Sequence, residues 1–260
     1  MNAVSKKNRY QFIFTLLIVT LSQISFAQTS DSTKKVYHFS GTALITNNGI
    51  SFIPTFSLGK PATIINLSMG DKRLSFDPEF RFSLEGKPWS ILLWGRYKVT
   101  NTDRFKFTAG THLGLSYNTP SATINGTTYE IIQVKRYWAG ELVPNYIINK
   151  HISVGLYYLF SHGLDAGTTK NTHFLTLNSN ITNIPLTKAF FVGLKPQVYY
   201  LQMDNLNGYY ASATVSVNKT KFPIYVSAIF NQKIQSTIVS NNFVWNLSLN
   251  YAFNNNFIHK

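Results

Sequence analysis

The sequence predicts an all-β protein, an antiparallel up-and-down transmembrane β-barrel of about 12 strands (range 10–14). Three observations carry this prediction. Long segments of the 260-residue chain alternate between apolar and polar side chains, 15% of the residues are aromatic although only 13% are charged, and no segment after the N-terminus reaches 18 apolar residues. A period of two is typical of strands with two different faces, and the missing apolar run argues against membrane-spanning helices.

The first residues have the pattern of an export signal. Three basic residues among the first nine precede an apolar run over residues 12–21, and the small-x-small sequence Ser25-Phe26-Ala27 follows. This is the order of a cleaved signal peptide, and the run is shorter than the roughly 20 apolar residues that a membrane-spanning helix needs. We expect residues 1–27 to be removed after Ala27 and residues 28–36 to form a short segment ahead of the barrel.

Composition and charge exclude several classes of protein. The chain has no Cys, which excludes disulfide scaffolds, thiolate metal sites and cysteine nucleophiles. The signal peptide contains three basic residues and no acidic one, so its removal lowers the formal net charge from +14 to +11. The remaining Lys and Arg residues are scattered singly, without a basic helix or stripe, so we expect no nucleic-acid partner.

Three segments show the alternation most clearly, residues 74–84, 105–117 and 243–253. In each, one side is apolar and the other carries small polar residues with isolated charges. A strand of about 12 residues rises about 3.3 Å per residue, and at a tilt of about 45° it spans close to 28 Å, the thickness of a bilayer core. A secreted β-sandwich would need a second layer over every aromatic face, and no helical pattern predicts one.

Turn signals divide the chain into thirteen candidate strands. These are residues 37–45, 50–58, 62–69, 74–84, 89–99, 105–117, 131–147, 151–162, 172–184, 190–203, 209–217, 223–235 and 241–253. Single-chain barrels have even strand counts, and the longer connections should lie at the end opposite the termini. Placing the longest connections, 118–130 and 163–171, at that end requires an odd number of strands before residue 118. One of the first three candidates is therefore not a separate strand, which leaves twelve.

Aromatic residues collect near the ends of the predicted strands, where amphipathic rings meet lipid headgroups. One end carries Trp89, Tyr117, Tyr158, Phe160, Tyr199, Tyr200, Tyr209, Phe243 and Trp245, and the other carries Tyr97, Phe105, Phe107, Phe190, Phe191, Tyr251 and Phe253. High strand propensity explains why these residues are abundant, but it does not explain their preference for strand ends.

Over residues 37–253 the chain resembles the outer-membrane β-barrel proteins of Gram-negative bacteria. The last predicted strand resembles the terminal signal that the barrel-assembly machinery reads, through its alternating residues Leu247, Leu249, Tyr251 and Phe253. It departs from that pattern because residues 254–260 follow, which we expect to form a C-terminal tail. The resemblance implies a location in the cell outer membrane, contact with outer-membrane lipid, and the assembly machinery as a partner during biogenesis.

Ionisable residues on the lumen side of the predicted hairpin 74–84/89–99 form the best polar constellation. If residues 85–88 form the turn, positions that sum to 173 face each other, so Asp77 lies opposite Arg96 and Ser75 opposite Lys98. The full predicted lumen charge cluster is Asp77, Glu79, Arg81, Arg96, Lys98, Lys106 and His112. Such a cluster either forms a charged constriction that selects solutes or an ion-pair network that fills the interior.

These features predict a non-enzymatic barrel, either a narrow pore for small solutes or ions or a structural or binding wall protein. The net positive charge favours anions in the lumen. The alternative is an outer-membrane hydrolase acting on lipid, because enzymes of this architecture carry a His-x-Ser pair on the outer wall. The sequence has two such pairs, His38-Phe39-Ser40 and His151-Ile152-Ser153, and alternation places Ser153 on the lumen side. No metal-ligand spacing or nucleotide-binding motif is present, so no cofactor is expected.

Overall fold

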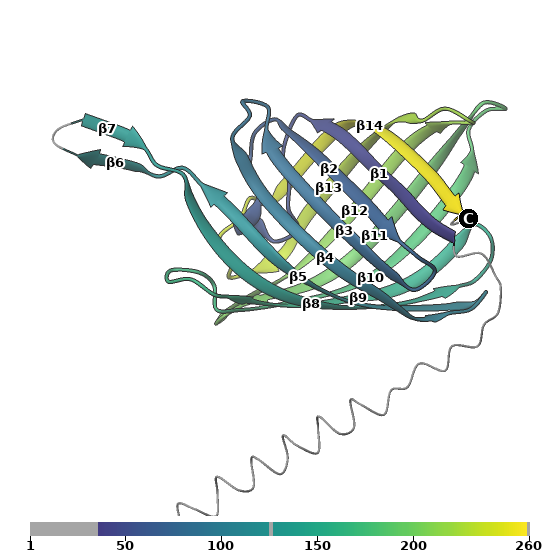
Figure 1. Ribbon diagram of the computed structural model, residues 1–260, viewed down its shortest axis with the longest axis horizontal. Helices are drawn as coiled ribbons and strands as arrows, with labels where there is room; N and C mark the ends of the chain where they lie inside the picture. Colours follow the sequence, from purple (N-terminus) through teal and green to yellow (C-terminus); the bar gives the residue numbers. More distant parts are fainter. Residues whose placement is uncertain (1–35, 125–126, 259–260) are drawn as a thin grey trace, which may run out of the picture. The chain divides into compact units, whose positions relative to one another are not determined.

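The structure is a computed structural model that describes residues 36–124 and 127–258, and its main body is a closed antiparallel β-barrel of 12 strands (Figure 1). In barrel order the strands are β1 (Val36–Thr46), β2 (Ala62–Gly70), β3 (Leu74–Ser83), β4 (Pro88–Asn101), β5 (Phe105–Asn118), β8 (Gln133–Ile147), β9 (Ile152–Gly163), β10 (Asn171–Pro185), β11 (Phe190–Met203), β12 (Leu206–Lys219), β13 (Ile224–Ser236) and β14 (Phe243–Ile258). The expected signal peptide lies outside the described residues. Among the residues described, no helix is long and apolar enough to cross a membrane.

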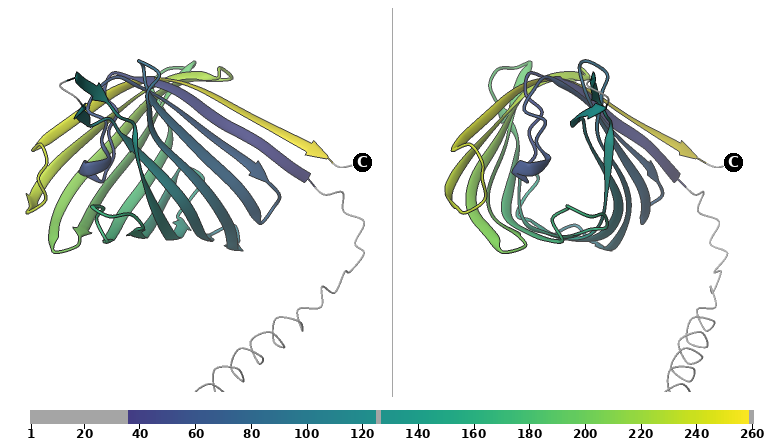
Figure 2. Two further views of the ribbon diagram at one scale, coloured as in Figure 1. Left: turned by 60° about the vertical axis from the view of Figure 1, so that its left-hand side comes forward. Right: turned by 90° about the vertical axis from the view of Figure 1, so that its left-hand side faces the viewer.

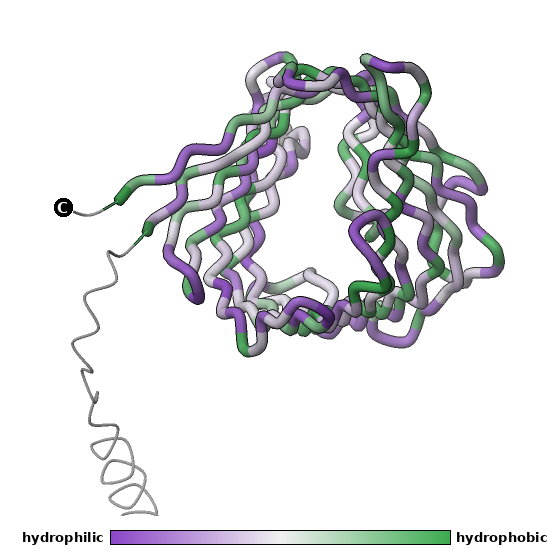
Figure 3. Tube along the Cα trace, turned by 90° about the vertical axis from the view of Figure 1, so that its right-hand side faces the viewer, coloured by the Kyte–Doolittle hydropathy of each residue, from purple (hydrophilic) through white to green (hydrophobic). Residues whose placement is uncertain are grey.

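The alternating sequence pattern produces a barrel that is apolar outside and largely polar inside. On β14, the outward side chains of Leu247 and Leu249 are 51% and 55% exposed, whereas the inward residues Ser248 and Asn250 are 5% and 3% exposed. Figure 3 shows hydrophobic and hydrophilic positions following one another along the strands. This is the reverse of a water-soluble protein, whose interior is formed by its apolar side chains.

The predicted strand at residues 50–58 is instead a connection that folds into the barrel. Residues 47–61, here called the inner loop, follow β1 and contain a 3₁₀ turn, Pro54–Phe56 (Figure 2). Pro54 and Pro61 lack the backbone N–H that a strand ladder requires. The apolar side chains of Phe52 and Ile53, in the inner loop, pack against the buried hydrophobic cluster inside the barrel. The prediction that one of the first three candidates is not a separate strand is confirmed.

The predicted loop 118–130 contains further structure. Strands β6 (Ser121–Ile124) and β7 (Thr127–Glu130) form a two-stranded hairpin that projects beyond β5 and β8 (Figure 1). We call this end of the barrel the loop end. The opposite end, where β1 begins and β14 finishes, is called the terminal end.

The last strand is longer than the sequence predicted. We expected a tail from residue 254, but β14 continues to Ile258 and pairs with β1 from Val36↔Ile258 to Thr46↔Ser248. The backbone of β1 offers hydrogen-bonding partners over this whole length, and the ring of Phe39 lies 5.2 Å from that of Phe253 between centroids. The segment with the predicted assembly signal therefore forms the seam that closes the barrel.

The register of the β3–β4 hairpin differs from the predicted one by two residues. Ser75 lies opposite Arg96, and Asp77 lies opposite Trp94. The turn begins one residue earlier than expected, and an irregularity after Arg81 brings Phe82 opposite Pro88. A slip of two residues keeps every side chain on its original face, so the assignment of Asp77 and Arg96 to the lumen survives the correction.

The inner wall formed by β9 to β12 is more apolar than the predicted small, polar lumen face. It contributes large buried side chains that pack beneath the inner loop: Leu159, Phe174, Tyr199, Leu201, Met203 and Tyr210. Two belts of aromatic residues near the strand ends were expected to face lipid. This expectation is correct for residues such as Tyr209, Trp245 and Tyr251, which are exposed on the outer face. It is wrong for Tyr199 and Trp89, which are buried inside.

Candidate functional site: the lumen

The strongest polar feature of the lumen is Arg96, which lies between two carboxylates. Its Nη1 is 2.9 Å from Asp77 Oδ2, and its Nε is 2.6 Å from Glu141 Oε1. The Glu141 side chain is only 1% exposed. Because Asp77 is diagonal to Arg96 rather than opposite, the predicted ion pair forms across the corrected register.

Hydrogen bonds extend this ion pair into a chain across the inner wall. Ser68 Oγ donates to Asp77 Oδ1 over 2.6 Å, and His38 Nε2 lies 3.0 Å from Ser68 Oγ. At the other end, Tyr157 Oη donates to Glu141 Oε2 over 3.0 Å. We call His38, Ser68, Asp77, Arg96, Glu141 and Tyr157 the lumen charge chain. Its members come from β1, β2, β3, β4, β8 and β9, so it runs across the strands rather than along one of them.

A glycine on the intervening strand makes this chain possible. Strand β5 lies between β4 and β8, and Arg96 must pass over it to reach Glu141. A Cβ atom at Gly110 would lie 2.8 Å from Glu141 Oε1 and 3.1 Å from Arg96 Cγ, closer than such contacts normally come. The bare backbone at Gly110 therefore provides the passage for the ion pair.

Three more residues of the predicted cluster, Glu79, Arg81 and His112, line the lumen beside this chain. Glu79 and Arg81 form their own ion pair, and the guanidinium of Arg81 lies 5.0 Å from the centroid of the Trp89 ring. His112 lies against Trp94, with ring centroids 4.2 Å apart, and Arg96 covers the same indole at 4.5 Å.

Lys98 and Lys106 do not join the cluster. Lys98 pairs in register with Thr108 and Lys106 with Asn101, both near the terminal end. Within the described residues, neither side chain forms an ion pair.

Sequence reasoning missed Glu141, Tyr157 and the inner loop. Glu141 could have been found, because a carboxylate inside the predicted strand 131–147 is tolerated only on its lumen side. Tyr157 had no comparable signal, since aromatic residues are common on both faces of this barrel. The sequence did not reveal the inner loop because its apolar residues have a pattern that is typical of a strand.

A cavity of about 610 Å³ lies between the inner loop and the charged wall. The inner loop and β10 line it with Phe52, Ile53 and Phe174, whereas β3 to β5 contribute Glu79, Arg81, Arg96 and His112. Three buried polar atoms that border it have no hydrogen-bond partner within the described structure: His112 Nδ1, Ser90 Oγ and Thr176 Oγ1. The cavity therefore combines apolar rings, compensated charges and free hydrogen-bonding groups.

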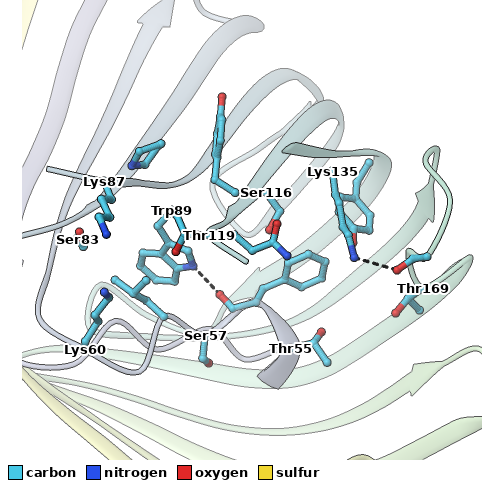
Figure 4. A pocket seen from close by; sticks show the side chains of 17 residues that line it. Thr55, Ser57, Lys60, Ser83, Lys87, Trp89, Ser116, Thr119, Lys135 and Thr169 are labelled. Carbon is cyan, nitrogen blue, oxygen red and sulfur yellow. Dashed lines mark hydrogen bonds between the residues drawn. The ribbon is translucent and has the colours of Figure 1, made fainter. Parts of the chain in front are cut away.

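A second cavity, of about 500 Å³, opens near the loop end (Figure 4). Three lysines line it, and each has a partner: Lys60 lies 3.3 Å from Glu85, Lys87 pairs with Glu130, and Lys135 donates to the carbonyl of Gly167 over 3.0 Å. Trp89 forms part of this wall and donates from Nε1 to the carbonyl of Phe56 over 2.8 Å, which holds the inner loop in place.

The two His-x-Ser pairs do not form the outer-wall arrangement that a lipid hydrolase would need. His38 and Ser40 share the lumen face of β1, where His38 contacts Ser68. His151 lies in the turn before β9, and Ser153 shares the lumen face of Tyr157. Among the described residues, no group of three or more acidic, His or Cys side chains is placed to hold a metal ion.

Comparison with known proteins identifies the fold. No family model matches the chain, and no curated protein matches its sequence. Among solved structures, the KdgM porin in complex with disordered oligogalacturonate is similar with a TM-score of 0.52 and 10% sequence identity, covering 83% of this chain and 99% of the porin. The KdgM porin alone gives a TM-score of 0.50 at the same identity and coverage. The chain therefore has the fold of outer-membrane β-barrel proteins.

Proposed function

We propose that this protein is a non-enzymatic outer-membrane channel with a narrow lumen. The observation that carries the proposal is a closed barrel whose outer face is apolar and whose interior holds a cavity between a charged wall and an inward-folded loop. Strands of 14 residues such as β4 and β5 suit a bilayer, since about 12 tilted residues already span a core of about 28 Å. This location makes outer-membrane lipid the partner of the exposed apolar side chains.

The inner loop supports a narrow pore rather than a wide one. Phe52 lies beside Phe174 and Tyr199, with ring centroids 6.4 and 5.8 Å away, so the loop packs against the wall by its apolar side chains. The hydrogen bond from Trp89 to Phe56 holds it from the opposite side. A loop held at both sides of a 12-strand barrel reduces the free cross-section, which sets an upper limit on solute size.

The distribution of lumen charges supports a preference for anions at the terminal end of the pore rather than in the middle. At mid-barrel Arg96 is paired with carboxylates, and closer to the loop end Arg81 is paired with Glu79. Towards the terminal end, Lys98, Lys106 and Lys195 share the lumen face, and within the described residues none of the three forms an ion pair. Unpaired charges of one sign at a pore mouth attract counter-ions into it.

The position of the terminal strand supports the proposed assembly signal. Leu247, Leu249 and Tyr251 are exposed on the outer face of β14, at the seam where the barrel closes. A machinery that reads this strand would contact it before β1 pairs with it. We therefore propose the barrel-assembly machinery as the biogenesis partner.

Single-channel recording of the refolded protein in planar bilayers tests this function. We expect small, resolved conductance steps and a reversal potential in a salt gradient that indicates anion preference. Replacing Lys98, Lys106 and Lys195 together by Gln should move that potential toward zero without closing the pore. As a control, Lys188→Gln, which removes one charge from the connection between β10 and β11, should change the potential less than any of the three replacements made singly. Absence of conductance in correctly folded protein would refute the channel.

A further inference from the structure

We propose that the 610 Å³ lumen cavity is a binding site for an uncharged solute that contains a planar ring and a hydrogen-bonding group. This inference rests on the proposed channel function and names the class of solute that the constriction would accept. Neither a purely ionic pore nor a solid plug accounts for the combination of groups around the cavity, and three of its properties lead to the same ligand class.

The first property is an apolar, aromatic surface in a place that water would otherwise fill. Phe52 and Phe174 have nearly parallel rings, 12° apart, and both line the cavity. Leu92 and Trp94 face them from β4. Apolar surface in contact with water is unfavourable, and covering it with a ring releases that water. The favoured occupant therefore has an aromatic or comparably flat apolar body.

The second property is the set of buried polar atoms without partners. His112, Ser90 and Thr176 are 8%, 6% and 1% exposed, and they reach the cavity from β5, β4 and β10. Buried polar groups in folded proteins nearly always have a hydrogen-bond partner, from the protein, from water or from a ligand. Two hydroxyl groups and an imidazole nitrogen can all serve a hydroxyl, amide or carbonyl group of a solute.

The third property is charge compensation. The ionic groups that line the cavity are Glu79, Arg81 and Arg96, and each forms an ion pair within the wall. A charged solute would therefore have to break one of these pairs or stay unpaired in a confined space, and both are unfavourable. An uncharged solute avoids this cost.

The size of the cavity sets the scale of the ligand. Sites for small molecules typically enclose about 300–1,000 Å³, and this cavity of 610 Å³ lies within that range. Two fused aromatic rings with a short polar substituent suit such a space.

Isothermal titration of the refolded barrel in detergent, with three probes of one shape, tests the proposal. The probes are 2-naphthylmethanol, 2-naphthoate and 2-naphthylmethylamine, which are neutral, anionic and cationic at pH 7. We expect saturable binding of the neutral probe at one site per barrel and binding of both ions at least about tenfold weaker, since one broken ion pair suffices for such a difference. Titration into detergent alone removes the heat of partitioning.

Two pairs of variants separate the site from the outer wall. Phe52→Ala removes a cavity ring, and Phe160→Ala removes a ring from the outer face beside Trp138. Thr176→Val removes an unpartnered hydroxyl with little change of shape. Thr172→Val makes the same exchange of side chains at a buried position on the same face of β10, away from the cavity lining. We expect about fivefold weaker binding for Phe52→Ala and Thr176→Val and no change for their controls. The change in electrophoretic mobility that a folded barrel shows when it is heated before gel electrophoresis confirms that each variant is folded.

Uptake that does not saturate, equal binding of all three probes, or equal effects of the cavity and control variants would each overturn the inference. Conductance distinguishes this failure from failure of the channel. A protein that conducts but does not bind the neutral probe would leave the proposed function intact and remove the solute class. A protein that binds the probe but never conducts would keep the site and refute the channel.

Discussion

The two halves of the inner wall are stabilised in different ways. From β1 to β8, charged and polar side chains are linked by ion pairs and hydrogen bonds around Arg96. From β9 to β12, rings and aliphatic side chains pack against the inner loop, as in the core of a soluble protein. The comparison shows that a barrel lumen can be filled by either kind of interaction, and that the cavity lies where the two meet.

The largest effect should come from breaking the charged half. Replacing Arg96 by Ala leaves Asp77 and the buried Glu141 without their counter-ion, which should lower the free energy of unfolding by about 3 kcal/mol. Urea titration of the refolded barrel in vesicles measures this. The outer pair provides the control: Arg136→Ala, on an exposed ion pair with Asp165, should leave the midpoint unchanged. Equal midpoints for both variants would show that the lumen chain contributes no more than a surface pair.

Breaking the aromatic half should cost nearly as much but respond differently to salt. Phe174→Ala removes a buried ring that contacts Phe52, Tyr157 and Tyr199, with an expected loss of about 2–3 kcal/mol because the adjoining cavity relieves part of the penalty. Raising the salt concentration should leave this loss unchanged, whereas it should reduce that of Arg96→Ala. Parallel salt dependence in the two variants would contradict the division of the wall.

A smaller effect should follow from blocking the passage over β5. Gly110→Val places side-chain carbons where Arg96 and Glu141 meet and should cost about 1–3 kcal/mol, as overpacking usually does. Gly95→Val is the matched control, because a Cβ there has only the Thr111 carbonyl oxygen near it, at 4.0 Å. If Gly95→Val proved as damaging as Gly110→Val, strand propensity rather than the ion pair would explain the glycine.

The smallest effect concerns the loop end, outside both halves. Arg136 donates from Nη2 and from its backbone N to Asp165, and these hydrogen bonds lower the pKa of Asp165 to about 2. A carboxyl group with a depressed pKa stabilises the folded form of its own loop at pH values above the pKa of the unfolded chain, and this local contribution disappears as the pH falls from about 4 towards 2. The protection factors of the amides of residues 164–170, which correct hydrogen exchange for the pH dependence of the intrinsic rate, should therefore be constant above pH 4 and fall below it. A transition centred near pH 4 would show that the pair does not form.

Most of the fold could be predicted because alternation fixes faces independently of register. The assignment of Asp77 and Arg96 to the lumen required only the alternation of side chains between the two faces of each strand. It therefore remained correct although the predicted register was wrong by two residues. The register itself depends on an irregularity after Arg81, which leaves no mark in residue types. The inner loop was mistaken for a candidate strand because Phe52 and Ile53 bury their side chains against the opposite wall, a tertiary contact that local sequence does not encode.

The site was only half predictable for a related reason. Charged residues are informative in a membrane strand because lipid rejects them, so Glu79, Arg81 and His112 could be assigned inward from the sequence. Aromatic residues occur on both the lipid and the lumen face, so their type does not indicate the face, and Tyr199 was predicted on the wrong one. The aromatic half, and with it the cavity, could be seen only once the strands were closed into a barrel.

The gap at Gly110 also has a mechanical consequence. Backbone hydrogen bonds join each strand to its neighbours, and a closed barrel can still flatten by small changes at every junction. A side-chain link from β4 to β8 spans two junctions, β4–β5 and β5–β8, and joins strands that are not neighbours. It acts as a brace around the circumference of the charged half, so slow deformation of the cross-section should be concentrated in the aromatic half, beside the inner loop.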